Sequence, residues 1–231
     1  MSSRRKGLVS VVLTSWNRKA YLTQCLTQLA HQTYPNIEII IVDDGSSDGT
    51  VDVIQKWKRR LPLRLRHRVV FARMPRNTGY SGALTTAMFL ARGEFVATHD
   101  SDDFSHRDRI RRQVRYLRQH PHIGLVGTNY RSVKNGRVSP IQPNWLAFGP
   151  DRIRRCYQRG GHCITCGSLM FRGRLFDRLG GLNRRFVGSE DKEFVTRFSR
   201  AGVKMDNLRE VLYYVRSHPA QRSRKYHGKH R

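Results

Sequence analysis

The stretch Phe95-Val-Ala-Thr-His-Asp-Ser-Asp-Asp103 places three carboxylates, those of Asp100, Asp102 and Asp103, directly behind a strand-like run. The whole chain carries 44 Lys and Arg residues against 17 Asp and Glu residues, so this local excess of acid opposes the overall charge. Neighbouring carboxylates repel one another unless a cation or hydrogen-bond donors lie between them. The stretch therefore has two interpretations: an acidic turn that closes a strand and caps the next helix, or a site for a cation.

On either side of this stretch, short β-branched runs alternate with amphipathic segments. The 231 residues suffice for one domain with a substantial core. Strands are expected at Leu8–Thr14, at Ile37–Asp43, within Leu65–Phe71, at Phe95–Thr98 and at Ile123–Gly127. Helices are expected at Ala20–Gln32, Thr50–Arg60, Ser81–Ala91 and Arg107–His120. This order predicts an α/β fold with a mostly parallel, Rossmann-like sheet and helices on both faces.

The pattern changes after about residue 128. A Gly- and Pro-rich region, Asn135–Pro150, precedes segments that predict a strand at Cys163–Phe171 and helices at Arg172–Leu179 and Asp191–Ala201. Two further strands, Lys204–Leu208 and Val211–Val215, are expected to pair with each other. We therefore expect one domain over residues 8–216, divided near residue 128 into a larger half (8–128) and a small subregion (129–216). Residues 1–7 form a basic N-terminal extension and residues 217–231 a basic tail.

The net charge of +27 is unevenly placed. Residues 1–100 contribute +8 and residues 101–231 contribute +19, so the second half is suited to an anionic partner. Nucleic acid, an anionic membrane surface and an acidic or phosphorylated glycan all fit this charge. Zinc-finger spacing and an RNA-recognition aromatic signature are missing from the sequence, and carboxylates at strand ends would repel phosphate. Nucleic acid is therefore the less favoured partner.

Four cysteines, Cys25, Cys156, Cys163 and Cys166, suggest no disulfide framework, which favours a reducing cytoplasm. Together with His162, the last three would supply four zinc ligands. Zinc is not favoured, because a second Cys-x-x-Cys is missing and Cys163 and Cys166 would face opposite sides of a strand. The sequence contains no apolar stretch of about 18 residues, and the start leads into a short strand rather than a signal peptide.

Polar residues follow three of the predicted strands. Thr14–Arg18 comes after the first, Asp43-Asp44 after the second and Asp100–Asp103 after the fourth. Because parallel strands end at the same edge of a sheet, we expect the three clusters to meet there. This coincidence favours a ligand site over a solvated turn.

Six segments together resemble the inverting family 2 glycosyltransferases of the GT-A fold. They are Leu8–Arg18 (LVSVVLTSWNR), Ile39–Thr50 (IIIVDDGSSDGT), Asn77–Gly79 (NTG), Arg92–Phe95 (RGEF), Asp100–Asp103 (DSDD) and Gly188–Asp191 (GSED). They occur in the family's order and at familiar spacing, and the resemblance covers roughly residues 8–218.

The resemblance implies a single GT-A domain, with residues 8–128 as the nucleotide-sugar-binding half and residues 129–216 as the acceptor-binding half. It implies metal-dependent transfer of a sugar, with inversion, from a nucleotide-diphosphate sugar to a hydroxyl acceptor. A UDP-sugar is the first expectation for the donor, and a glycan or lipid-linked molecule for the acceptor, in polysaccharide or glycoconjugate synthesis. A cytoplasmic enzyme is expected, in peripheral contact with anionic lipid at the inner face of the membrane.

The resemblance also assigns residues. Mn²⁺ or Mg²⁺ would be held by Asp102, with further contacts from Asp100 and His218, the last within an unusually basic tail. Nucleotide-sugar contacts would come from the loops behind the strands: Thr14, Trp16, Arg18, Asp43, Asp44, Asn77, Gly79, Asp100 and Ser101. Asp44 resembles the carboxylate that accepts a hydrogen bond from a uracil-type N–H, and Trp16 an aromatic that stacks on the base. The chain departs from the family at Ala83-Leu84-Thr85, where many relatives carry an arginine; Arg73 or Arg76 is the candidate substitute.

Glu190 and Asp191 are the predicted catalytic pair. Inversion is a single displacement, so one base must take the acceptor's proton, and the resemblance gives that role to Asp191. The alternative is that both carboxylates only stabilise a helix N-terminus. Two other functions stay open: a nucleic-acid-binding protein that uses its basic surface, and a nucleotide-sugar binder without catalysis.

Overall fold

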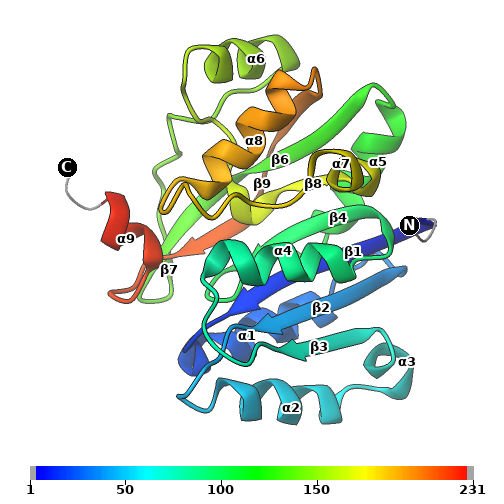
Figure 1. The fold of residues 1–231 in the computed structure, drawn as a ribbon, viewed down its shortest axis with the longest axis vertical. Coiled ribbons are helices and arrows are strands. Elements are labelled where there is room, and N and C mark those ends of the chain that lie inside the picture. The colour runs from blue at the N-terminus through cyan, green and yellow to red at the C-terminus, as the bar shows by residue number, and fades with distance from the viewer. Residues whose placement is uncertain (1–3, 228–231) are drawn as a thin grey trace.

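The computed structural model describes residues 4–227, and within them one mixed sheet runs through the molecule (Figure 1). Its strands lie in the order β3-β2-β1-β4-β8-β6-β9-β5, with β7 paired to β6. The strands are β1 (Arg5–Ser15), β2 (Ile37–Asp43), β3 (Val69–Arg73), β4 (Gly93–Asp100), β5 (Phe104–Ser105), β6 (Ile123–Lys134), β7 (Arg137–Val138), β8 (Met170–Arg172) and β9 (Lys204–Arg216). The helices are α1 (Lys19–Ala30), α2 (Thr50–Arg60), α3 (Leu63–Arg66), α4 (Tyr80–Leu90), α5 (Arg109–Gln119), α6 (Pro150–Gln158), α7 (Gly173–Leu179), α8 (Glu190–Arg200) and α9 (Arg222–His227).

The first half of the sheet confirms the predicted parallel α/β arrangement. β1 pairs in parallel with both β2 and β4, and β2 pairs in parallel with β3. Every residue of β2 is buried, as expected of a parallel strand that helices cover on both faces. The strands therefore all end at one edge of the sheet, where the predicted polar clusters lie.

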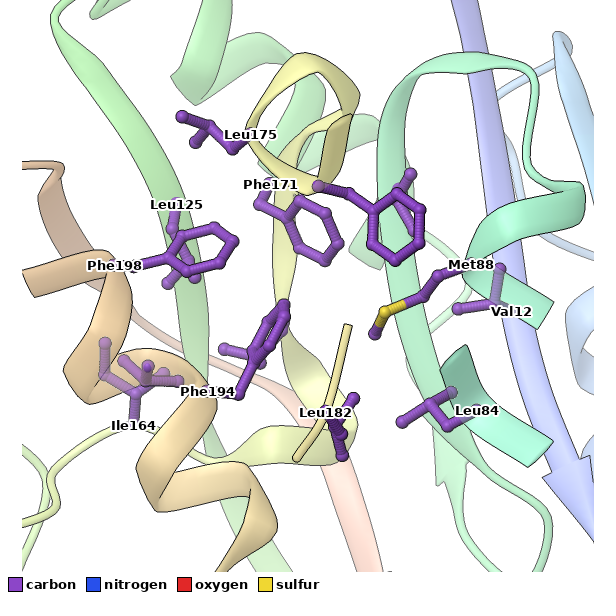
Figure 2. Packing of buried hydrophobic residues seen from close by; sticks show 14 of the residues in the cluster. Val12, Leu84, Met88, Leu125, Ile164, Phe171, Leu175, Leu182, Phe194 and Phe198 are labelled. Carbon is purple, nitrogen blue, oxygen red and sulfur yellow. The ribbon is translucent and has the colours of Figure 1, made fainter. Parts of the chain in front are cut away.

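Two hydrophobic cores hold the helices against the two faces of this sheet. Successive residues of a strand point to opposite faces, so Val11 joins the core under α1, α2 and α5, while Val12 joins the other core. That second core packs α4, α7 and α8 on the sheet and contains the rings of Phe171, Phe194 and Phe198 (Figure 2). Their centroids lie 4.6 to 5.7 Å apart. Each buried ring contributes roughly 1.5–3 kcal/mol through the apolar surface it removes from water.

The prediction of a strand over Cys163–Phe171 is wrong for most of its length. The chain makes a 3-10 turn at Cys166–Ser168, and only Met170–Arg172 pairs, in antiparallel fashion, with β4 and β6. Side chains take the place of a ladder: Asn207 Nδ2 donates to the Cys163 carbonyl at 2.8 Å and Arg109 Nη1 to the Gly167 carbonyl at 2.9 Å. Buried carbonyls thus have partners without a strand.

The expected pairing of Lys204–Leu208 with Val211–Val215 is also wrong. Both segments belong to the continuous strand β9 of 13 residues, which runs parallel to the 12-residue strand β6. Two register shifts around Asn129 absorb the mismatch between them. The intervening Arg209-Glu210 has none of the turn residues that a hairpin needs.

After β9 the chain returns to the edge of the sheet where β1 and β2 end. Figure 1 shows α9 on the side toward which these two strands point, away from the N-terminus. In the part of the chain that the structure describes, no helix is both long and apolar enough to cross a bilayer. The four cysteines, which all lie in this part, are free thiols.

Candidate active site

The sheet register brings the three predicted strand ends together. Thr14 of β1 is the partner of Asp100 at the end of β4, and Ser15 is the partner of Asp43 at the end of β2. The backbone N–H of Asp44 also donates to the Ser15 carbonyl at 2.8 Å. The polar clusters that follow the strands therefore form one continuous site.

Asp43 and Asp44 are both buried, but their side chains have different partners. Asp43 Oδ2 accepts the Ser46 N–H at 3.0 Å and lies 3.8 Å from Arg73 Nε. Its Oδ1 is buried and has no hydrogen-bond partner among the described residues. Asp44 Oδ1 accepts both the N–H (2.7 Å) and the hydroxyl (2.8 Å) of Thr78. Asp44 thereby ties the end of β2 to the loop of Asn77–Gly79.

The segment Gly45–Gly49 is a turn that starts α2. Asp48 accepts the N–H of Thr50 at 2.9 Å and that of Lys19 at 3.1 Å, so it caps the start of two helices. Gly45 has φ +73°, and a Cβ there would lie 2.9 Å from the backbone of Arg76. Trp16, beside this turn, is 51% exposed, which excludes a role as a core anchor.

Asp102 is held by two residues from distant parts of the chain. Its Oδ2 lies 3.1 Å from Arg18 Nε and 3.0 Å from His218 Nε2. Arg18 also donates to the carbonyl of Ala220 at 3.2 Å, and the His218 ring packs on Tyr21 with centroids 4.2 Å apart. Burial would raise the pKa of Asp102, but the hydrogen bond from His218 and the charge of Arg18 outweigh burial and hold it below its usual range.

The pair Asp102 and His218 fits a divalent cation. Adjacent ligands of an octahedral ion at about 2.1 Å stand about 3 Å apart, close to the 3.0 Å between His218 Nε2 and Asp102 Oδ2. A carboxylate oxygen and an imidazole nitrogen are both ligands for Mn²⁺. Among residues 4–227, however, no group of three or more His, Cys, Asp and Glu side chains lies close enough to share one ion. The role predicted for Asp100 as a further metal contact stays a prediction.

Asp100 and Asp103 are buried carboxyl groups whose pKa values are raised at this site. Burial, with the charges of Asp102 and Asp191, raises the pKa of Asp100 to about 7. Burial and the neighbouring Asp100 and Asp102 likewise raise the pKa of Asp103, although its Oδ1 accepts the Arg216 N–H at 2.8 Å. A bound cation would favour the charged forms of these groups.

Arg109 is a residue of the site that the sequence analysis missed. Its side chain is fully buried, and its guanidinium donates to the carbonyls of Thr98 (3.0 and 3.1 Å) and Gly167 (2.9 Å). It thus fixes the end of β4 against the turn before β8. Helical periodicity offered a signal, because Arg109 lies four residues before the buried Gln113 on α5.

Glu190 and Asp191 both lie in the first turn of α8 but face different surroundings. Glu190 is buried and forms an ion pair with Arg222 of α9, whose guanidinium lies over the ring of Tyr80 at 4.9 Å. The side chain of Asp191 is 36% exposed, and its Oδ2 lies 3.9 Å from His162 Nε2. The negative charge of Asp191 contributes to the raised pKa of Asp100, so the two carboxylates influence each other electrostatically.

The segment from Ser217 to His227 closes one side of the site. His218 contacts Asp102, the carbonyl of Ala220 accepts from Arg18, and Arg222 contacts Glu190. Residues 217–231 were expected as a basic tail, of which 228–231 lie outside the described residues. The contacts of Arg222 with a buried carboxylate could not be predicted from the composition of this segment.

Of the predicted site residues, the structure brings together those on the strand ends and His218. Ser101 is buried beside Asp102, while Asn77 accepts the Gly79 N–H through Oδ1 at 3.1 Å and so shapes the loop that leads into α4. Arg73 lies against Asp43 and also donates to the Ser46 carbonyl at 3.2 Å. Arg73 therefore places a cation beside the end of β2, and its role as substitute for the arginine missing from Ala83–Thr85 stays a prediction.

Comparison with known proteins is consistent with this arrangement. The sequence model described as "Glycosyl transferase family 2" matches residues 10–180. The chain is 28% identical over 215 residues to EpsE of Bacillus subtilis (strain 168), covering 90% of this chain and 72% of EpsE. It is 27% identical over 215 residues to "UDP-Glc:alpha-D-GlcNAc-diphosphoundecaprenol beta-1,3-glucosyltransferase WfaP" of Escherichia coli, covering 91% of this chain and 78% of WfaP.

Two solved structures share the fold. TarS 1-349 of S. aureus, solved in complex with UDP-GlcNAc, superposes with a TM-score of 0.76 at 22% identity, covering 93% of this chain and 60% of that chain. The mannosyltransferase PcManGT from Pyrobaculum calidifontis, solved with GDP-Man and Mn²⁺, gives a TM-score of 0.69 at 24% identity, covering 96% and 59%. This chain therefore spans about 60% of the length of those two solved chains.

Proposed function

This chain belongs to glycosyl transferase family 2, and we propose that it moves a sugar, with inversion, from a nucleotide-diphosphate sugar to a hydroxyl acceptor. The observation that carries the proposal is the meeting of the strand ends, which sets Asp43, Asp44, Asp100 and Asp102 around one site that Asp191 borders. As a glycosyltransferase with relatives such as WfaP, the enzyme is proposed to act in polysaccharide or glycoconjugate synthesis.

The donor nucleotide is proposed to lie over the loops behind β1 and β2. Trp16 is exposed there and offers a ring face for the base. No group among residues 4–227 donates a hydrogen bond to Asp43 Oδ1, and a buried acceptor without a donor costs about 1–3 kcal/mol. A hydroxyl or ring N–H from a nucleoside would supply that partner. A UDP-sugar is the proposed donor, because Asp44 can accept from the ring N–H of uracil; TarS was solved with UDP-GlcNAc, but PcManGT with GDP-Man.

Asp102 and His218 are proposed to hold Mn²⁺ or Mg²⁺, with Asp100 nearby. The ion would stabilise the negative charge that grows on the leaving diphosphate. Arg18 now lies on the same oxygen of Asp102, so metal binding would require this guanidinium to move toward the diphosphate. In that position the Arg18 guanidinium would donate two N–H groups to phosphate oxygens.

Asp191 is proposed as the base, with Glu190 as its structural neighbour. A half-exposed carboxylate can reach an acceptor hydroxyl, whereas Glu190 is buried against Arg222. The two residues therefore have different proposed roles. Asp191 takes the proton, and Glu190 holds α9 through Arg222. Residues 8–128 are proposed to bind the donor and residues 129–216 the acceptor. His218 and Arg222, which follow this domain in the chain, contact Asp102 and Glu190 of the site.

The excess of positive charge is proposed to hold the enzyme against anionic lipid at the inner face of the membrane, near lipid-linked acceptors. Arg115 and Arg118 are exposed residues of α5 and are proposed to make this contact. A cytoplasmic location agrees with the free thiols of all four cysteines. Sedimentation with liposomes that contain phosphatidylglycerol, compared with neutral liposomes, tests this part.

A thermal-shift screen of UDP- and GDP-sugars with and without Mn²⁺ tests the donor, because a ligand that binds the folded state raises the Tm. Nucleotide release is then measured for the parent, Asp102→Ala and Asp191→Asn. Turnover of both variants at the parent rate would overturn the mechanism. Tight nucleotide binding without release or transfer would indicate a binder without catalysis, and salt-sensitive DNA retention without nucleotide binding would indicate a nucleic-acid-binding protein.

A further inference from the structure

The far side of Asp191 carries an aromatic cluster, Tyr130, Trp145 and His162, to which the proposed function assigns no role. The Trp145 ring stacks on the His162 ring, with centroids 5.7 Å apart and planes 18° from parallel. Its indole N–H donates to the Tyr130 hydroxyl at 3.0 Å. Trp145 is nevertheless 38% exposed. Because the only polar atom of the indole is already hydrogen-bonded, the ring presents hydrocarbon surface to solvent.

The cluster is held in place by a buried side chain. Asn207 of β9 donates to the carbonyls of Ala147 (2.7 Å) and Cys163 (2.8 Å). These carbonyls lie two residues after Trp145 and one residue after His162, so a single amide clamps the two segments that carry the stacked rings. A surface assembled in advance in this way loses little conformational freedom when a ligand binds to it.

His162 connects this cluster to the proposed base. Its Nε2 lies 3.9 Å from Asp191 Oδ2, and its Nδ1 lies 2.9 Å from the Tyr157 hydroxyl. Burial raises the pKa of Tyr157, so its hydroxyl stays protonated and available to the imidazole. The imidazole therefore lies between the exposed indole and the carboxylate, with Trp145 on one side of it and Asp191 on the other.

We propose that Trp145 is the platform of an acceptor subsite, on which a sugar ring of a glycan acceptor stacks; this rests on the proposed function. A pyranose ring has a face of C–H groups and a rim of hydroxyls. His162 covers one face of the indole, so this sugar ring packs on the exposed part of Trp145, and the next sugar of the glycan extends past His162 toward Asp191. An acyl chain fits less well, because it would cover the polar atoms of Tyr130, His162 and Asp191 without replacing their contacts with water.

Steady-state kinetics separate this subsite from the donor site. We expect Trp145→Ala to raise the acceptor KM about tenfold or more, while the donor KM and the slow hydrolysis of donor by water stay within twofold of the parent. Trp145→Phe keeps a flat ring and should retain most of the acceptor affinity. Phe89→Ala removes an exposed aromatic ring from α4 and is the matched control. An unchanged acceptor KM in Trp145→Ala would overturn the platform and leave the proposed function standing.

Direct binding provides a readout that does not depend on turnover. Saturation-transfer NMR is recorded with chitotetraose, maltotetraose and laminaritetraose on the folded parent, Trp145→Phe and Trp145→Ala. We expect transfer to the C–H protons of at least one tetrasaccharide in the first two proteins and its loss in the third. Equal signals in all three proteins, or signals in none, would overturn the platform. If the parent releases no nucleotide from any donor, the proposed function fails separately, and this binding experiment still decides the platform.

Discussion

His218 Nε2 lies 3.0 Å from Asp102 Oδ2, although the two residues are 116 positions apart in the chain. The contact makes the segment behind β9 part of the site, because the same carboxylate oxygen also accepts from Arg18 in the loop behind β1. Asp102 thus connects the loop behind β1 with the segment behind β9.

Asp102→Asn should abolish Mn²⁺ binding and lower transfer at least about a hundredfold, because the neutral amide is a poor ligand for a hard cation. Electron paramagnetic resonance of unbound Mn²⁺ measures the binding directly. Asp151→Asn removes an exposed carboxylate from α6 and serves as the control of equal charge. A variant at position 102 that still binds Mn²⁺ with the parent's affinity would rule out Asp102 as the metal ligand.

Asp44→Asn should weaken UDP binding about tenfold and narrow the preference for UDP over CDP. Uracil presents a ring N–H to a carboxylate, whereas the corresponding nitrogen of cytosine is an acceptor and is repelled by it. Calorimetric titration with UDP and CDP measures both effects. The fold should be preserved, because Thr78 can still donate to the remaining carbonyl oxygen. If the ratio of the two affinities does not change, Asp44 does not contact the base.

Local patterns were enough to predict the parallel half of the fold and the strand-end clusters. Ile37–Asp43 is a continuous apolar run followed by acid, and its boundaries in the structure are those predicted. The structure of Cys163–Phe171 depends instead on Asn207 and Arg109, which bind its carbonyls from distant elements. The family resemblance assigned His218 and Asp102 to one metal site, but their contact depends on the path of β9, because no short-range pattern links residues so far apart.

Arg109→Ala should destabilise the protein by about 3 kcal/mol or more. The substitution leaves the buried carbonyls of Thr98 and Gly167 without their charged donor and opens a cavity. Urea unfolding followed by circular dichroism measures the change. Arg111→Ala, on the exposed side of the same helix, should change the free energy of unfolding by less than about 0.5 kcal/mol. Similar losses in the two variants would contradict the structural role of Arg109.

Asp100→Asn should stabilise the metal-free protein at pH 8 but not at pH 4. The carboxyl has a pKa of about 7 in the folded protein and an ordinary value of 3.8, so between these values the folded state binds more protons than the unfolded state. Stability therefore falls as the pH rises through this window, by up to about 4 kcal/mol for a buried group. The asparagine of the variant does not ionise, so the variant does not lose this stability as the pH rises. Its Tm relative to the parent, measured with EDTA at both pH values, checks the sign.

His99, which precedes Asp100, also changes stability with pH and must be separated from it. Burial lowers the pKa of His99 to about 3, so its contribution runs the opposite way and stability rises with pH between about 3 and 6.5. Both proteins contain His99, so its contribution largely cancels, and the difference reports Asp100 together with the change that Asp100 causes in the pKa of Asp103. An equal Tm difference at pH 4 and pH 8 would show that position 100 does not titrate between them.

Asp191→Asn and Glu190→Gln should fail in different ways, although the residues are adjacent. Asp191→Asn removes the proposed base, so kcat should fall about 10²- to 10⁴-fold while the affinity for UDP and the Tm stay close to the parent's. Glu190→Gln keeps the base but replaces the buried carboxylate that binds Arg222 with a neutral amide, so the charge-assisted contact that holds α9 is weakened. The expected result is a lower Tm and faster proteolysis after β9, with kcat reduced far less. Arg222→Met should lower the Tm further in the same direction, because it leaves the buried carboxylate of Glu190 without its cation. If Glu190→Gln instead abolishes turnover while Asp191→Asn retains it, the base is Glu190, and the segment behind β9 must move to expose it.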